Sequence, residues 1–219
     1  MVESTPGKTS DGLVRRWRKP KQARSWARVN RMLDVAEKNF MEQGYAAATT
    51  KQIAADAEVP IGSLYQFFPD KAAILQALAE RYTDLFKERL RLFQSDEVLA
   101  LPLPDYVVRL TQEADCFFRE HPAYRAIFVE VMATMPETDE AMDDQIIQTC
   151  IEILPKLNDS LEPTEYEIIA FVLVKAIGHL HWVSSGQAPE LRERLLLEIQ
   201  RLAFNYLNSY FHDEGSENN

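Results

Sequence analysis

Glycine is scarce in this sequence, with 7 residues among 219. Enzymes that cradle a phosphate, or that expose a nucleophilic serine on a sharp turn, need glycine-rich segments at those points. The sequence contains neither a phosphate-cradling glycine loop nor a Gly-x-Ser-x-Gly motif. These two common routes to catalysis are therefore excluded, and we expect no catalytic residues.

Cysteine and long apolar runs are also scarce. Cys116 and Cys150 both stand within apolar helical patterns, and neither belongs to a pair with metal-ligand spacing. Buried free thiols of this kind fit a reducing cytoplasm. No apolar run at the N-terminus resembles a signal peptide, and no uninterrupted apolar stretch approaches the length needed to span a bilayer. We therefore expect a cytoplasmic protein with no membrane partner.

The 4 histidines are poorly spaced for a metal site. His179 and His181 are two residues apart, so on a helix they point to different sides. No Glu-x-x-His or His-x-x-x-His pair places two ligands on one helical face. We expect no metal and no cofactor, and we interpret these histidines as packed or interface residues. A helical metal-dependent enzyme that uses His121, His179, His181 and Glu130 is the competing hypothesis.

The net charge of −10 argues at first against binding to nucleic acid, because Lys and Arg drive phosphate binding. The distribution reverses that argument. Residues 1–71 hold 12 Lys and Arg against 8 Asp and Glu, a net charge of +4, whereas residues 72–219 carry −14. An acidic body of this kind turns the basic end of the molecule toward a duplex.

The segment 49–71, TTKQIAADAEVPIGSLYQFFPDK, predicts two short helices joined by a tight turn. Apolar residues recur at helical spacing on both sides of a bend at residues 58–60, so the two helices share one small core. Thr49 and Thr50 can cap the first helix, and Pro60 suits the start of the second. Such a pair places its second helix in a DNA groove, although a packed helical pair with no DNA role has the same pattern.

The second helix carries the groups that a groove reader needs. Gly62 lets the backbone approach a surface closely, and Ser63, Tyr65 and Gln66 have hydrogen-bonding groups off the apolar face. Lys71 stands in the first turn of the next helix, where a cation interacts unfavourably with the helix dipole. A nearby phosphate would compensate for that interaction.

This segment resembles the helix-turn-helix of the TetR family of transcriptional regulators. The family pattern is matched by Thr50, Ile53, Ala54, Val59, Gly62-Ser63-Leu64-Tyr65, Phe67-Phe68 and Lys71. The resemblance implies that Thr50, Tyr65 and Lys71 contact phosphates. It also implies that base edges lie against Ile61, Gly62, Ser63 and Gln66.

Two positions depart from the family pattern. Glu58 stands where the family commonly has glycine in the turn, and Pro60 stands where a serine or threonine often caps the recognition helix. Thr49, Lys51 and Pro60 complete the set of residues in this segment that we assign to DNA contact.

A basic segment precedes the first predicted helix. Residues 1–24 are small, polar and turn-forming at first and then rich in arginine and lysine, which predicts a flexible arm. Arginines in such an arm can track phosphates or enter a minor groove. The alternative is a solvated tail that aids solubility. The arm residues that we assign to DNA are Arg15, Arg16, Arg18 and Arg24.

The remaining periodicity is helical throughout, so we predict an all-α fold with about nine helices. The predicted helices outside the two-helix segment are 26–44, 71–93, 105–120, 122–134, 140–157, 164–185 and 190–212. The expected organisation is a flexible arm (1–24), a DNA-binding head of three helices (25–72), an effector-binding and dimerisation body (73–213) and a polar tail (214–219). The long helix after Lys71 would link head and body.

The last two predicted helices carry more apolar residues than one buried face requires. The surplus indicates a homodimer through these helices, as in the four-helix interface of the resembled family. A dimer would read a palindromic operator in double-stranded DNA, with half-sites about 34–36 Å apart.

The resemblance also implies a pocket in the body for a small-molecule effector of unknown identity, and apolar walls with a few polar groups suit one. An ordinary core has the same pattern. The candidate ligand-binding residues are Phe117, Phe118, His121, Tyr124, Arg125, Phe128, Met132, Phe171, Lys175 and His179. The function that we predict is a sequence-specific transcriptional regulator, by default a repressor that a ligand releases from its operator. The alternatives are a helical enzyme and a protein-interaction module without DNA binding.

Overall fold

The computed structural model describes residues 16–211, and every regular element in that range is helical. In chain order the elements are α1 (Ala23–Ala47), α2 (Thr50–Asp56), α3 (Ile61–Phe67), α4 (Lys71–Arg91), the 3-10 helix η1 (Leu92–Gln94), α5 (Asp96–Leu99), α6 (Leu103–Glu120), α7 (Pro122–Thr134), α8 (Pro136–Leu157), α9 (Pro163–Val172), the π-helix η2 (Leu173–Gly178), α10 (His179–Ser185) and α11 (Pro189–Phe211). The all-α class is confirmed. Each predicted helix has a counterpart, and η1 and α5 are additions too short for a helical period to reveal.

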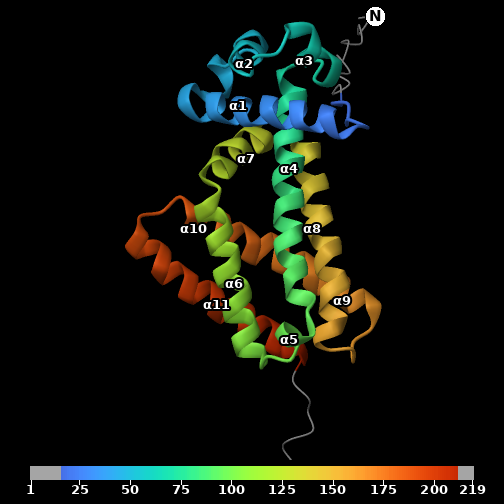
Figure 1. Ribbon diagram of the computed structural model, residues 1–219. Coiled ribbons are helices and arrows are strands. Elements are labelled where there is room, and N and C mark those ends of the chain that lie inside the picture. Colours follow the sequence, from blue (N-terminus) through green and yellow to red (C-terminus); the bar gives the residue numbers. More distant parts are fainter. Residues whose placement is uncertain (1–15, 212–219) are drawn as a thin grey trace, which may run out of the picture.

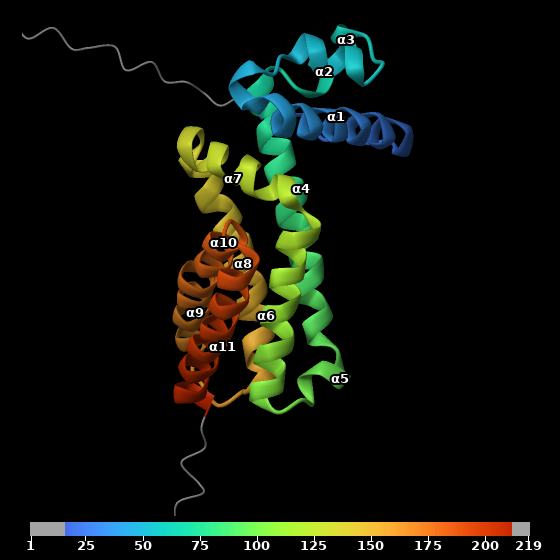
Figure 2. The ribbon, with the colours of Figure 1, turned by 90° about the vertical axis from the view of Figure 1, so that its left-hand side faces the viewer.

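The molecule is elongated, with a head formed by α1, α2 and α3 at one end (Figure 1). From the head, α4 runs through most of the body, and α7 lies between the head and the other body helices. Figure 2 shows α9, α10 and α11 together on one side of the body, with α4 and α6 on the other. The two helices that were predicted to form the dimer interface correspond to α9, η2 and α10 and to α11. Together these elements form the outer wall of the body.

One hydrophobic core joins the head to the upper body. Ile53 and Leu64 of the helix pair are completely buried and belong to the same cluster as Ile74 and Leu78 of α4. The cluster continues into α7 through Ile127. A displacement of α4 must therefore move side chains that pack against the helix pair, because close-packed interiors leave little free space.

A second core cluster lies at the far end of the body. It is formed by α6, α8, α9 and α11, with Val107, Ile147, Ile169 and Leu207 among its buried residues. This cluster holds the outer wall against α8.

The rod made of α9, η2 and α10 was predicted as one α-helix from 164 to 185. The structure keeps a continuous helical path over residues 163–185 but widens it to a π-helix at Leu173–Gly178. Such π-segments occur frequently at functional sites. Here the segment faces the body cavity described below.

The same rod is long and apolar enough to cross a bilayer by length and composition, with a mean hydropathy of 1.5. We expected no uninterrupted stretch of that length, and Glu165, Glu167 and Lys175 do interrupt this one. Only 22% of its most apolar window is buried within the chain. The helix forms a wall of the body cavity through η2 and α10.

Candidate nucleic-acid interface and ligand cavity

The turn between α2 and α3 is closed by backbone hydrogen bonds. Val59 N–H donates to the carbonyl of Ala54 at 2.9 Å, and Glu58 N–H donates to that of Ala55 at 3.0 Å. This is the Schellman pattern, whose residue after the C-cap adopts a left-handed conformation that glycine favours. Glu58 has φ 54° there. Glu58, which stands where the family commonly has glycine, therefore strains the backbone of this turn.

The helix α3 buries one residue and exposes the predicted readers. Leu64 is completely buried, whereas Tyr65 is 47% exposed and Ile61 is 39% exposed. Gly62 and Gln66 are also exposed, and Ser63 is half-buried. Apart from its two chain neighbours and the backbone of its own helix, no heavy atom of the described residues lies within 4 Å of the place where a Cβ on Gly62 would stand, so the backbone at Gly62 is open to a docking surface.

The residues at the start of α2 lie beside that surface. Thr49 caps the helix, since its hydroxyl accepts a hydrogen bond from Gln52 N–H at 3.2 Å. Thr50 Oγ1 lies 3.1 Å from the hydroxyl oxygen of Tyr65. Lys51 is exposed. Two predicted phosphate contacts, Thr50 and Tyr65, thus come from different helices and meet at one point.

Pro60 occupies the N-cap of α3. The sequence had placed this residue in the first turn of the helix. Its φ of −56° and ψ of 137° are extended, and the helix has no side-chain cap. The Pro60 carbonyl accepts hydrogen bonds from Ser63 N–H at 2.8 Å and Leu64 N–H at 3.3 Å. The residue therefore begins the helix by its fixed φ and its carbonyl alone.

Lys71 has a structural role that the sequence did not reveal. Its ammonium group donates to the carbonyls of Tyr45, Ala46 and Ala48 at 2.5, 3.1 and 2.9 Å. These three carbonyls follow Gly44 in the chain. Gly44 was expected to end the first helix, but its φ of 81° only interrupts α1, which continues to Ala47. These carbonyls offset the unfavourable interaction between the Lys71 cation and the dipole of α4. The sequence had assigned that role to a DNA phosphate. Contact of Lys71 with phosphate stays a prediction.

The described part of the basic arm packs on the head. Trp17 is 8% exposed and stacks on Phe68, with ring centroids 5.8 Å apart. Its indole N–H donates to Glu80 of α4 at 3.2 Å, and Arg18 N–H donates to the Phe67 carbonyl at 2.8 Å. The prediction of a flexible arm through residue 24 was therefore wrong for residues 16–24, because Trp17 anchors the segment and α1 already begins at Ala23. An aromatic anchor within a basic run is not visible in composition. Residues 1–15, with Arg15, and the predicted tail 214–219 lie outside the described residues.

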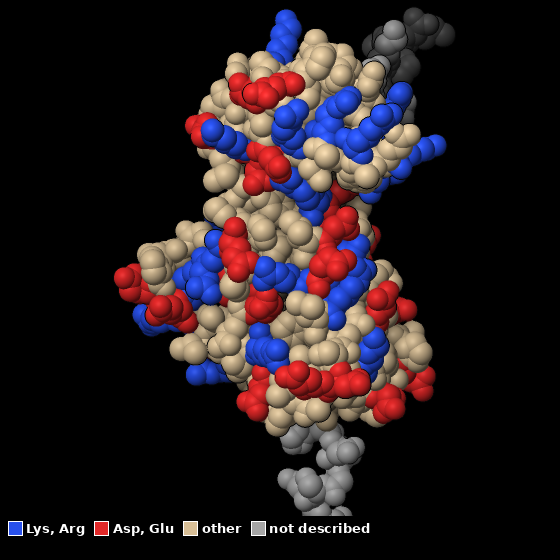
Figure 3. All heavy atoms as spheres, in the orientation of Figure 1, with Lys and Arg blue, Asp and Glu red and all other residues tan. Residues whose placement is uncertain are grey.

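This packing places basic side chains next to the end of α3. Arg16, Arg18 and Arg24 are exposed, and Figure 3 shows Lys and Arg gathered over the head. The body below it carries acidic patches among its basic residues. The charge separation predicted from the sequence thus corresponds to the two ends of the molecule.

The body encloses a cavity of about 230 Å³. Its walls come from α4, α6, α7, α8, η2, α10 and α11. Six of the ten predicted ligand residues line it: Phe118, Tyr124, Phe128, Met132, Lys175 and His179.

The other four predicted ligand residues do not line this cavity. Phe117 is completely buried in the core, and His121 packs against its ring with centroids 4.6 Å apart. Arg125 lies over the Trp182 ring at 4.8 Å and donates to the Trp182 carbonyl at 3.1 Å. Phe171 is 53% exposed. Helical spacing identified the right helices but could not show which face of each one points inward.

Two acidic residues of α8 line the cavity and were missed. Asp143 pairs with Lys175, which has a raised pKa because of that hydrogen bond. Burial and the nearby Asp143 carboxylate raise the pKa of Asp139. Their spacing of four residues on one helix is the signal that could have found them, since such residues share a face.

His181 also lines the cavity and was not predicted to do so. It is 5% exposed, and its Nε2 has no hydrogen-bond partner in the described chain. Burial lowers the pKa of His181 to about 4, so the ring is neutral at neutral pH. An unpartnered polar atom in the wall of a cavity is a contact point for a ligand.

The competing hypothesis of a metal-dependent enzyme finds no ligand set in residues 16–211. No group of three or more His, Cys, Asp or Glu side chains that could hold a metal ion occurs there. His179 is exposed and His181 is buried, and both line the cavity.

Comparisons with known proteins match both parts of the fold. Residues 32–78 match the family of bacterial regulatory proteins named tetR, and residues 102–207 match the tetracyclin repressor-like C-terminal domain. A curated relative from Bacillus subtilis, the uncharacterized HTH-type transcriptional regulator YhgD, is 30% identical over 182 residues, which cover 78% of this chain and 91% of the relative. The chain belongs to the TetR family of transcriptional regulators.

Other relatives of this TetR-family regulator agree with that assignment. The HTH-type transcriptional regulator HbdR of Aromatoleum is 36% identical over 63 residues, covering 29% of this chain and 28% of HbdR. A TetR-family regulator from Streptomyces coelicolor has the same fold, with a TM-score of 0.66, 24% identity and coverage of 86% and 99% of the two chains. SmeT, the repressor of the Stenotrophomonas maltophilia multidrug efflux pump SmeDEF, has a TM-score of 0.61 at 23% identity, covering 85% and 91%.

The family assignment supports the hypothesis of a DNA-binding regulator. This TetR-family chain is a DNA-binding transcriptional regulator, a class that is not normally enzymatic. Such regulators bind operator DNA and small-molecule effectors and form dimers.

Proposed function

We propose that this regulator is a cytoplasmic repressor that binds a palindromic operator as a homodimer and leaves it when a small molecule fills the body cavity. The observation that carries the proposal is that one helix, α4, joins the head to the cavity. Ala73 and Leu75 of α4 are completely buried near the head, whereas Thr83, Phe86 and Leu90 line the cavity. A ligand that moves the cavity end of α4 would therefore change how the head is held.

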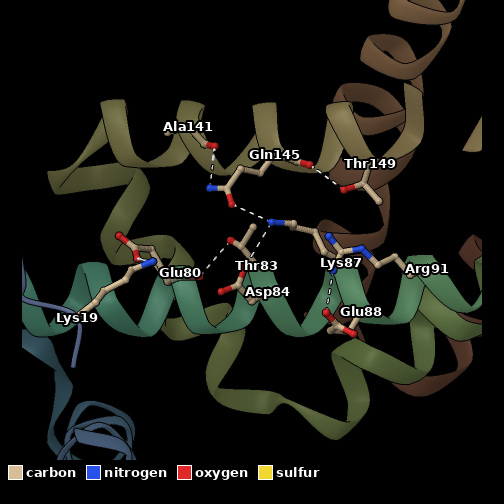
Figure 4. Close-up of polar contacts among 11 residues, drawn as sticks. Lys19, Glu80, Thr83, Asp84, Lys87, Glu88, Arg91, Ala141, Gln145 and Thr149 are labelled. Carbon is tan, nitrogen blue, oxygen red and sulfur yellow. Dashed lines mark hydrogen bonds and ion pairs between the residues drawn. The ribbon is translucent and has the colours of Figure 1, made fainter. Parts of the chain in front are cut away.

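Polar contacts fix α4 to its neighbours at several levels. Near the head, Arg81 of α4 pairs with Asp34 and Glu37 of α1. Level with the cavity, Lys87 donates to Gln145 Oε1 of α8 at 3.1 Å, as Figure 4 shows. The head and α8 thus both hold α4, through side chains that lie six residues apart on it.

Ligand control requires unequal binding to two arrangements of the dimer. The effector must bind more tightly to the arrangement whose heads do not match the operator spacing, because equal affinity shifts no equilibrium. The cavity is formed by seven elements, so a small relative movement of α4 and α8 changes its shape. This gives a ligand a physical basis for unequal binding.

The dimer surface that supports the proposal lies on the outer wall. Ile168 is 59% exposed on α9, and Leu197 and Leu202 are 62% and 51% exposed on α11. Apolar side chains at this exposure on adjacent helices indicate a protein interface. A second copy packed there would place two heads side by side for two half-sites about 34–36 Å apart.

The experiment is selection of bound duplexes from a random pool with the full chain. We expect a palindromic consensus with two half-sites. Gln66→Ala should relax preference at one or two bases in each half-site, because Gln66 is exposed on α3 and carries a side-chain amide that can read a base edge. Lys51→Ala, as a matched control on α2, should weaken binding to all sequences about equally. Recovery of no consensus would contradict the proposal.

A further inference from the structure

The walls of the body cavity are mainly aromatic and aliphatic. Tyr124 and Phe128 stack with ring centroids 4.0 Å apart, and both line the cavity. Phe86, Phe118 and Trp182 add further aromatic surface. A ligand for these walls must have a substantial apolar part, and flat rings suit stacking against them.

The charges in the wall do not balance. Two carboxylates, Asp139 and Asp143, line the cavity with one lysine, Lys175. Lys175 pairs with Asp143. The Asp139 carboxylate has neither a hydrogen bond nor an ion pair to any described residue, although Lys175 and His179 attract it at longer range. The two carboxylates of the wall therefore share one lysine.

His181 in the wall does not restore the balance. Burial lowers the pKa of His181 to about 4, which keeps this ring uncharged under physiological conditions. Its unpartnered Nε2 can still exchange a hydrogen bond with a bound molecule.

The Asp139 carboxylate and the stacked aromatic pair line the same cavity. Asp143 and Asp139 both contribute to raising the pKa of Tyr124, after the larger effect of burial. Burial is also the main cause of the raised pKa of Asp139, so a bound cation would stabilise the ionised form of this carboxylate. Carboxylate and ring faces together form the environment in which amines and quaternary nitrogens are bound.

We propose that the effector is a hydrophobic monocation whose nitrogen binds Asp139 against the rings of Tyr124 and Phe128, with its apolar part between Phe86, Phe118 and Trp182. The proposal rests on the assignment of this cavity as the effector site. Anionic effectors are disfavoured because the one lysine in the wall is already held by Asp143.

The test uses three probes with the same ring system and different charge: 2-naphthylmethylamine, 2-naphthylmethanol and 2-naphthoate. Binding of each probe to the full chain is measured by calorimetry at neutral pH. The amine should bind at least about tenfold more tightly than the alcohol, since a partly buried charged pair is worth that much. The carboxylate should bind more weakly than both.

Variants test whether Asp139 causes the preference for the amine. Asp139→Asn should remove the advantage of the amine and leave the alcohol unchanged, and Asp139→Glu should retain part of the advantage. Asp144→Asn is the matched control, because Asp144 is an exposed acid on the same helix outside the cavity wall. It should leave all three affinities unchanged.

Equal affinity for amine and alcohol in the unmodified protein would overturn the proposal, and this result does not depend on any variant folding. No binding of the amine at millimolar concentration, or an amine preference that survives Asp139→Asn, would overturn it as well. Release of selected operator DNA by the same probes is measured separately. Release by the naphthoate alone would support the proposed function and contradict the cationic class, whereas Asp139-dependent amine binding without any release would support the class and contradict the effector role.

Discussion

Glu58 shows how one residue can be kept in an unfavourable backbone conformation. Its φ of 54° lies in the left-handed region, which costs a non-glycine residue roughly 1–2 kcal/mol. The only ion pair of its carboxylate in the described chain is with Arg31 at 3.9 Å, and both side chains are exposed. Such a pair contributes little to stability. The strain is therefore not offset by this contact.

We expect Glu58→Gly to raise the free energy of unfolding by about 1 kcal/mol, after allowance for the greater freedom of glycine in the unfolded chain. Urea denaturation monitored by circular dichroism measures the change. Glu58→Gln is the control, since it removes the charge and keeps the Cβ. If the two variants are equally stable, backbone strain at this turn is not the cause.

A comparison of Lys71 with Lys51 distinguishes a lysine that stabilises the fold from a lysine that is free to contact phosphate. Lys71→Met should lower the free energy of unfolding by about 1–3 kcal/mol, because three carbonyls lose a charged donor. Lys51→Met should leave stability nearly unchanged, since Lys51 is exposed on α2. Denaturation curves for both variants, measured side by side, give the comparison. Equal stability of the two variants would remove the structural role of Lys71.

His181 gives the fold a pH dependence. Its pKa falls from 6.5 to about 4 on folding because burial disfavours the charged ring. Asp115 opposes this shift and Arg192 adds to it. Between these two values the unfolded chain binds more protons than the folded chain, so stability is full above the unfolded pKa and falls as the pH drops.

The expected loss from this one residue is about 2 kcal/mol between about pH 7 and about pH 5. Carboxylates also titrate in this range, so the quantity to measure is the difference between the unmodified chain and His181→Gln in urea unfolding at both pH values. The variant should lose less stability on acidification. Parallel losses would mean that His181 titrates normally.

At the scale of elements, the sequence predicted the helices well and their inward faces poorly. The helix pair was predictable because Thr49, Pro60 and Asp70 give chemical reasons for each boundary, and the structure shows Thr49 and Asp70 accepting cap hydrogen bonds. The π-helix η2 was not predictable, because its apolar residues repeat as an α-helix would. Asp139 was missed because an acidic residue near a helix start is usually solvated.

The outer wall is the element-scale feature that a mutation can test. Ile168→Glu, on α9, should convert the dimer to a monomer at micromolar concentration, because a charge at the centre of an apolar interface is costly. Leu92→Glu is a matched control, since Leu92 is 62% exposed against 59% for Ile168 and lies at the end of α4. Sedimentation velocity distinguishes the outcomes. A dimer that tolerates Ile168→Glu would place the interface elsewhere.

At the scale of the whole molecule, an acidic body carries a basic head. Residues 1–71 have a net charge of +4 in a chain of −10, so repulsion from the body and attraction to the head orient the molecule on a duplex. The anchored segment from Arg16 to Lys21 brings arginines beside α3. Together with α4, this arrangement gives a head that binds DNA and a body that can control it.

The most direct test of this account is the affinity of the full chain for its selected operator and for a scrambled duplex, measured by fluorescence anisotropy over a range of salt concentrations. The account predicts operator binding at least about a thousandfold tighter than scrambled binding at physiological salt. It also predicts that log K falls linearly with log salt for both duplexes, as phosphate contacts require. Equal affinity for the two duplexes, or binding that does not respond to salt, would contradict it.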